Sequence, residues 1–244
     1  MKTNIIFPLA ILLLAGCADP NHQTAKKETP RFLNSQPVEH RVNNASISTA
    51  QWKNTPFDEH IKQASARYGV DETLIKAIIQ VESNFRPEVI SKSNAVGLMQ
   101  IKASTAGRDI YQNRGKAGQP TTAQLKDPAT NIDLGTAYIQ LLRERHLSGI
   151  SNPETLYYAT ILAYVNGAGA LLRTFDKNRD AAIAKINAMS ADDFYRYVEK
   201  NHPASQAPRY LAKVKAAYHC YLAKVKAAYH LADNFSDKLA AAAD

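Results

Sequence analysis

The chain has 244 residues, of which 45% are hydrophobic, so it can form one domain of ordinary size with a real core, plus a tail. Its formal net charge of +8 favours a polyanionic partner such as a nucleic acid, an anionic membrane surface or an acidic cell-wall polymer. The seven histidines and two cysteines show no metal-ligand spacing and no phosphate-binding loop is present, so we expect neither a metal nor another cofactor.

The N-terminus has the form of a bacterial lipoprotein signal peptide over residues 1–16. Lys2 precedes an apolar run over residues 5–15, and the sequence Leu-Ala-Gly-Cys at 14–17 is typical of a lipobox, in which cleavage precedes a cysteine that is then lipidated. The run is too short to cross a bilayer as a helix. An ordinary secretory signal with an incidental cysteine is the alternative, but the small residues before Cys17 favour lipidation.

The similarity to lipoproteins implies three acyl chains on Cys17, which anchor far more firmly than one chain. Ala18, in place of Asp directly after that cysteine, implies the outer membrane, with the domain facing the periplasm. Because Cys17 is then acylated, Cys220 has no partner for an internal disulfide. Residues 17–54 are polar and without periodicity, so we expect a disordered tether with a mean reach of about 35 Å.

From residue 55 the sequence becomes helical, and no segment shows convincing strand alternation, so we predict one all-α domain over residues 55–219. Thr55 and Pro56 predict the N-cap and first residue of a helix that stops at Gly69, and Asp71 predicts the next N-cap. Further helix starts are predicted at Ser104, at the capping box Thr121 to Gln124, at Asp127, at Asn152 and at Ser190.

Glu82 lies where the second of these helices should carry an apolar side chain. Ile75, Ile78, Ile79 and position 82 follow the spacing of one helical stripe. A lone buried carboxyl at a helix C-terminus is costly to ionise, which predicts a raised pKa and a neutral acid able to give a proton. From the stripe alone, a helix that frays at Ser83 and leaves Glu82 solvated is an equal alternative.

Four short motifs follow one another along the chain: Glu82-Ser83, Ser91 to Asn94, Gly97 to Gln100, and Tyr164 to Gly167. In this order they resemble the lysozyme-like lytic murein transglycosylases, which implies an α-rich lysozyme-like fold. Over residues 70–210, including the segments 166–175 and 201–210, the sequence is most similar to the membrane-bound, endo-acting type E subgroup.

The resemblance implies that Glu82 protonates the glycosidic oxygen between N-acetylmuramic acid and N-acetylglucosamine in peptidoglycan glycan strands. The same carboxylate then takes the proton of the muramoyl C6 hydroxyl, which leaves a 1,6-anhydro ring and makes the enzyme a lyase of cell-wall turnover. The resemblance also implies substrate-binding roles for Ser91, Ser93, Gln100, Tyr164 and Tyr210. Gln100 could instead be a helix N-terminal residue, and Tyr164 could be a core tyrosine with a satisfied hydroxyl.

Alternatives to this interpretation stay open. Asn166 stands one residue later than in the usual Ala-Tyr-Asn element, which puts its binding role in doubt, and Glu88 is the only other local carboxylate. A hydrolytic muramidase would share Glu82, and a lipid-anchored scaffold could bind glycan without cutting it. A nucleic-acid binder would explain the charge, but neither the lipobox nor Glu82, so we expect that no nucleic acid is bound. We also expect the protein to be a monomer.

The tail repeats one segment, Tyr-Leu-Ala-Lys-Val-Lys-Ala-Ala-Tyr-His, at residues 210–219 and again at 221–230. Eleven residues are close to three helical turns, so equivalent positions fall on nearly the same face. Two copies are too few for a solenoid. We therefore expect the first copy to belong to the domain, and residues 220–244 to form a duplicated helical tail that projects beyond it.

Overall fold

The computed structural model describes residues 55–241, so the predicted signal peptide, Cys17 and the tether lie outside the described residues. The described chain is helical, as predicted, with ten α-helices. They are α1 (Asp58–Tyr68), α2 (Glu72–Ser83), α3 (Arg108–Asn113), α4 (Thr122–Lys126), α5 (Pro128–Leu141), α6 (Pro153–Asn166), α7 (Ala168–Phe175), α8 (Arg179–Asn187), α9 (Ala191–Asn201) and α10 (Gln206–Ala241).

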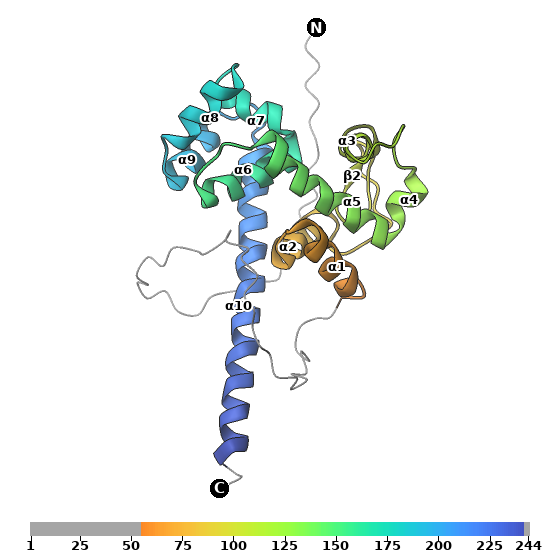
Figure 1. Cartoon of the computed structure of the whole chain (residues 1–244), viewed down its shortest axis with the longest axis vertical. Coiled ribbons are helices and arrows are strands. Elements are labelled where there is room, and N and C mark those ends of the chain that lie inside the picture. Colours follow the sequence, from red (N-terminus) through yellow and green to blue (C-terminus); the bar gives the residue numbers. More distant parts are fainter. Residues whose placement is uncertain (1–54, 242–244) are drawn as a thin grey trace.

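The long helix α10 organises the arrangement (Figure 1). Its first half packs on α2 and α6, with α6 to α9 on one side and α1 to α5 on the other, while its C-terminal half extends beyond the rest of the domain. Within residues 55–241, no helix combines the length and the apolar composition that crossing a bilayer requires.

Five predicted helix starts are confirmed by their caps. In each, the cap side chain accepts a hydrogen bond from the backbone N–H three residues later, which satisfies a donor that the helix itself leaves unpaired. Thr121 and Gln124 form the full reciprocal capping box. The five caps are Asp71, Thr121, Asp127, Asn152 and Ser190.

Two predicted starts were wrong. The first helix begins at Asp58, because Thr55 closes a turn in which its carbonyl accepts from the Asp58 N–H at 3.2 Å and its hydroxyl donates to the Asp58 carboxylate at 2.6 Å. Ser104 lies inside a π-helical turn over Ala103–Gly107, and α-helical geometry starts only at Arg108. A second π-helical turn, Leu142–His146, continues α5 and was not predicted.

The expectation of no strands was also wrong, because a short antiparallel hairpin pairs β1 (Ala95–Val96) with β2 (Ile101–Lys102). Two residues per strand are too few to show an alternating pattern in the sequence. The turn requires Gly97, whose φ is +81° and whose added Cβ would lie 2.2 Å from Nδ2 of Asn131.

Apolar faces of the helices meet in one continuous core. The predicted stripe of α2 is buried at Ile75, Ile78 and Ile79, and Ile61 and Ala64 of α1 are buried as well. The largest fully buried side chains come from nearly every part of the described chain: Phe194, Ile61, Ile75, Ile78, Ile79, Leu98, Met99, Ile101, Ile110, Leu125, Ile132 and Ile139.

Both copies of the repeat lie on the continuous helix α10, but their environments differ. Leu211 and Val214 of the first copy are fully buried, whereas their equivalents Leu222 and Val225 are half-buried. A shift of α10 by one repeat would put Tyr218 in place of Ala207, which is also fully buried. The added volume of a tyrosine ring would overpack that position, so the first copy occupies the domain.

We expect a chain that ends after Leu222 to keep the free energy of unfolding of the full chain within about 0.5 kcal/mol, because the buried residues of α10 precede that point. Urea denaturation measures the difference. A chain that ends after Arg209 is the control, since it lacks Leu211 and Val214 and should lose at least about 4 kcal/mol. A large loss on the shorter deletion would show that the second copy is part of the fold.

Candidate active site

Glu82 lies in the last turn of α2, at the end of the buried isoleucine stripe. The following Ser83 is only 2% exposed, and its hydroxyl donates to the carbonyl oxygens of Ile79 at 3.2 Å and Leu98 at 2.8 Å. The helix therefore holds its geometry through Ser83, and the alternative of a frayed end with a solvated Glu82 is wrong. The residue keeps some accessible surface, while its carboxyl group is enclosed by protein atoms.

A single hydrogen bond joins this carboxyl to the C-terminal helix. The Tyr210 hydroxyl donates to Oε1 of Glu82 at 2.6 Å across 128 residues of sequence. Burial raises the pKa of Glu82 from its ordinary value near 4.5 to about 7, although the Tyr210 hydrogen bond opposes the rise. Since Oε1 accepts from Tyr210, a neutral Glu82 carries its acid proton on Oε2.

Tyr164, at the end of α6, lies beside this acid. Its hydroxyl donates to the carbonyl oxygen of Met99 at 2.7 Å, and burial followed by the charge of Glu82 keeps the pKa of Tyr164 well above its ordinary value. The ring of Tyr138 lies 5.8 Å from the Tyr164 ring, centroid to centroid. Tyr164 thus has the satisfied hydroxyl of a core tyrosine and also lies next to Glu82.

Ser91 and Ser93 lie together on the loop that precedes the hairpin. The hydroxyls of Ser91 and Ser93 are 3.0 Å apart, and Oγ of Ser91 accepts from the backbone N–H of Ala95. In the described part of the chain, no hydrogen bond joins either serine to Glu82. Their predicted contact with substrate therefore remains a prediction.

Gln100 lies in the turn between the strands, so its alternative as a helix N-terminal residue is wrong. Its φ is +48°, and its side-chain amide donates to the carbonyl oxygens of Val89 and Gly97 at 3.1 and 2.9 Å. The side-chain N–H groups of Gln100 thus hold the hairpin, and its Oε1 makes no hydrogen bond to the described residues. Leu98 and Met99 in the same turn are fully buried.

Sequence reasoning missed Asn131, which fixes the same hairpin from α5. Its Oδ1 accepts from the backbone N–H of Met99 at 2.7 Å, and its Nδ2 donates to the carbonyl oxygens of Val96 and Leu125 at 2.9 and 2.6 Å. The side chain is fully buried, and all three bonds lie inside the protein. The sequence signal was an asparagine in the first turn of a helix, which is too common to single out.

Asn166 and Glu88, whose roles the sequence left open, differ in their surroundings. Asn166 is the last residue of α6, and its Nδ2 is buried without a hydrogen-bond partner among the described residues, so a donor is available two residues from Tyr164. Glu88 pairs with Lys126 at 2.7 Å and is 71% exposed. The carboxylate of Glu88 thus lies on the surface, whereas the carboxyl of Glu82 is buried.

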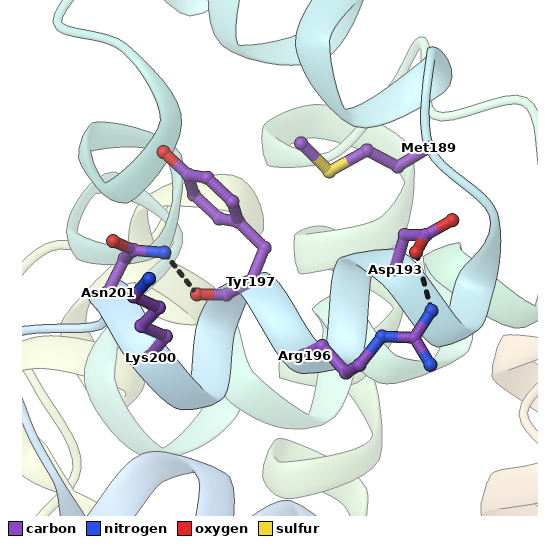
Figure 2. Close-up of a pocket in the computed structure, with 6 residues that line it drawn as sticks. All are labelled: Met189, Asp193, Arg196, Tyr197, Lys200 and Asn201. Carbon is purple, nitrogen blue, oxygen red and sulfur yellow. Dashed lines mark hydrogen bonds and ion pairs between the residues drawn. The ribbon is translucent and has the colours of Figure 1, made fainter.

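A hollow of about 440 Å³ on and beside α9 is separate from this group (Figure 2). None of the predicted site residues lines it, and Arg196 in its wall pairs with Asp193 at 2.6 Å. Its lining residues are Met189, Asp193, Arg196, Tyr197, Lys200 and Asn201. Across residues 55–241, no cluster of three or more His, Cys, Asp and Glu residues is arranged to hold a metal ion.

Residues 59–187 match the family described as the transglycosylase SLT domain, a range that contains Glu82, Ser91, Ser93, Gln100 and Tyr164 but not Tyr210. The 70 kDa soluble lytic transglycosylase SLT70 of Escherichia coli is 26% identical, with a TM-score of 0.52 over 68% of this chain and 24% of that one. An inactive mutant of the lytic transglycosylase Slt of Pseudomonas aeruginosa is 22% identical, with a TM-score of 0.54 over 74% of this chain.

This chain spans about a quarter of the length of each of these two proteins. The fold that they share with it is the α-rich, lysozyme-like one that the sequence predicts, so the predicted fold class is confirmed.

The raised pKa of Glu82 predicts how stability depends on pH. The folded state holds the proton of Glu82 more tightly than the unfolded chain does. The contribution of this proton to the free energy of unfolding is therefore complete below pH ~4.5 and is lost as the pH rises through about 7. Glu82→Gln removes the ionisation. From pH 5 to pH 8, we expect the free energy of unfolding of the variant to increase relative to that of the parent, by at most about 3 kcal/mol.

Urea denaturation of both chains at each pH measures this difference. The matched control is Glu88→Gln, which changes a carboxyl on the surface and should follow the parent at each pH. If Glu82→Gln also follows the parent, Glu82 ionises as an ordinary solvated carboxyl.

Proposed function

Because the chain belongs to the transglycosylase SLT-domain family, we propose that it is a peptidoglycan lytic transglycosylase, which cleaves the β-1,4 bond from N-acetylmuramic acid to N-acetylglucosamine without water. One observation carries the proposal. Glu82 is a buried acid with a pKa of about 7, and Tyr210 donates a hydrogen bond to it. Burial raises this pKa and the Tyr210 hydrogen bond lowers it, and no second carboxylate contributes to the shift.

Bond cleavage begins with the proton on Oε2 of Glu82. Transfer of this proton to the glycosidic oxygen lets the bond from that oxygen to the muramoyl anomeric carbon break, and N-acetylglucosamine leaves with a free 4-hydroxyl. The acetamido group of the muramoyl sugar stabilises the positive charge at the anomeric carbon. The Tyr210 hydroxyl, 2.6 Å from Oε1, stabilises the carboxylate that Glu82 has become.

Ring closure then restores the acid. The Glu82 carboxylate takes the proton from the C6 hydroxyl of the same muramoyl sugar, and the C6 oxygen bonds to the anomeric carbon. The product carries a 1,6-anhydro ring, Glu82 is protonated again, and no water is consumed. The single carboxyl of Glu82 thus acts first as an acid and then as a base.

Hydrolysis by the usual glycosidase route needs a second carboxylate flanking the scissile bond. Glu88, the local candidate, is on the surface and pairs with Lys126. The enclosed setting of Glu82 therefore supports the lyase over the hydrolytic muramidase, and an acid with a raised pKa supports an enzyme over a scaffold that only binds glycan.

The finer features of the proposal rest on the sequence motifs. We propose an endo-acting, monomeric enzyme of cell-wall turnover, on the resemblance of residues 70–210 to the type E subgroup. We also propose that lipid on Cys17 holds it at the outer membrane, facing the periplasm, on the lipobox and Ala18. Glycan strands are its partner, and the positive charge of the chain suits their acidic polymer.

Incubation of the full chain, in detergent, with purified peptidoglycan should release fragments with 1,6-anhydromuramoyl ends, which mass spectrometry identifies. Internal cuts should give fragments of many lengths from the start of the reaction. Reducing muramic ends alone would identify a hydrolase, and binding without any cleavage would leave the scaffold.

The control for this assay is Glu82→Gln, which keeps the shape of the side chain and the acceptor for Tyr210 but has no transferable proton. We expect cleavage to fall by more than about a hundredfold while the helical circular dichroism is kept. Glu88→Gln should retain activity. A folded Glu82→Gln chain with near-normal rates would place the acid elsewhere.

Cys17→Ala tests the anchor, because the thiol is the attachment point for lipid. We expect the variant to leave the outer-membrane fraction and to remain soluble or as uncleaved precursor, which fractionation and mass measurement detect. Cys220→Ala is the matched control and should stay with the membrane. A processed Cys17→Ala chain in the outer membrane would show that the lipobox has been misread.

A further inference from the structure

The Lys215 side chain reaches from α10 to two neighbouring helices. Its ammonium donates to the Tyr158 hydroxyl of α6 at 2.7 Å, and lies 4.1 Å from the centroid of that ring and 5.1 Å from the centroid of Tyr195 on α9. The Tyr158 hydroxyl donates in turn to Glu154, one turn earlier on α6, at 2.5 Å. Lysines are mostly exposed, but this one is half-buried against two aromatic rings. Lys215 thus makes directional contacts with α6 and α9 at once.

Few directional contacts hold the first half of α10 in the domain. Within residues 206–217, the side chains that hydrogen-bond to other described helices are those of Tyr210 and Lys215. The buried Leu211 and Val214 of the same stretch contribute apolar packing, which is not directional. The two hydrogen bonds therefore supply the directional restraint on α10.

These two hydrogen bonds lie at different heights and on different faces of α10. Five residues separate Tyr210 from Lys215, which corresponds to about 7.5 Å along the helix axis and about 140° around it. Tyr210 reaches Glu82 on α2, whereas Lys215 reaches α6 and α9. A rotation of α10 about its axis would move the Tyr210 hydroxyl away from Oε1 of Glu82. The contacts of Lys215 oppose that rotation.

We propose that Lys215 is a positioning residue for the proposed reaction, because its contacts with Tyr158 and Tyr195 hold α10 where the Tyr210 hydroxyl meets Glu82. This rests on the proposed function, since it concerns the same acid. Lys215 acts through Tyr210, which lies five residues earlier on the same helix. A displacement of about 1 Å would lengthen the 2.6 Å bond from Tyr210 to about 3.6 Å, a separation at which it is no longer a hydrogen bond. Lys215 therefore controls how well the Glu82 carboxylate is stabilised.

The charged groups around Lys215 suit this role. Burial lowers the pKa of Lys215, and the negative charges of Glu154 on α6 and Asp192 on α9 oppose that change. On α10 itself, burial and then the charge of Lys215 lower the pKa of His219 below its ordinary value of 6.5, so this histidine adds no repelling charge near neutral pH. The two carboxylates thus favour the ammonium form, which the contacts with the aromatic rings require.

NMR titration of the Glu82 carboxyl carbon, in the full chain in detergent, tests this role without using catalysis. Lys215→Met keeps most of the aliphatic stem but removes the ammonium, so the Tyr210 hydrogen bond should weaken and the pKa of Glu82 should rise by about 0.5 or more. Tyr158→Phe removes the same bond from the α6 side and should raise the pKa too. The matched control is Lys226→Met, the same change at the equivalent exposed lysine of the second copy, which should leave this pKa unchanged.

A double-mutant cycle shows whether Lys215 acts through Tyr210. Tyr210→Phe removes the hydrogen bond to Glu82 outright, so adding Lys215→Met to that variant should raise the pKa of Glu82 no further. A further rise in the double variant overturns the proposal. So does a pKa that stays at the parent value in folded Lys215→Met or, if that variant does not fold, in Tyr158→Phe.

Cleavage of peptidoglycan by the full chain gives a second readout. We expect Lys215→Met to lower kcat about tenfold at nearly constant KM, and Lys226→Met to cleave as the parent does. A merely structural role would lower the free energy of unfolding and leave kcat of the folded chain unchanged, which overturns the proposal. The titration does not depend on the products, so hydrolysis or an absence of cleavage would overturn the proposed function while the pKa of Glu82 still decides whether Lys215 positions Tyr210.

Discussion

The hydrogen bond from Tyr210 to Glu82 is the interaction on which the site depends. It joins the last turn of α2 to the first half of α10 at 2.6 Å. Burial by itself makes the carboxyl costly to ionise, and the phenol recovers part of that cost, so the pKa is held at about 7 rather than higher. Such a group can give a proton and take one back within a narrow range of pH.

The region facing this acid is held by bonds from three helices to one short hairpin. Ser83 of α2 binds the carbonyl of Leu98, Tyr164 of α6 binds the carbonyl of Met99, and Asn131 of α5 binds the N–H of Met99. Gly135 lets the Met99 side chain lie directly on α5, since an added Cβ would be 2.4 Å from its Sδ. The hairpin is therefore fixed before any ligand arrives, which is the condition for precise proton transfer.

The repeated segment shows how one sequence acquires two roles. Lys215 of the first copy donates to the Tyr158 hydroxyl at 2.7 Å, whereas its equivalent in the second copy, Lys226, is exposed on the surface. Tyr210 reaches Glu82, and Tyr221, one repeat further, lies about 16 Å along the helix axis. Identical residues thus either build the domain or extend from it, according to their distance from the end of α9.

The sequence by itself determined the helices with side-chain caps, such as those at Asp71 and Thr121, because a cap is a bond between near neighbours. It also determined the apolar setting of Glu82, because the isoleucine stripe lies on the same helix. Only the tertiary structure decided that Tyr210 is the partner of Glu82 and that Asn131 holds the hairpin. These depend on contacts between segments far apart in the chain, which no local pattern records. The motif resemblance indicated only that Tyr210 binds substrate, not that it is the partner of Glu82.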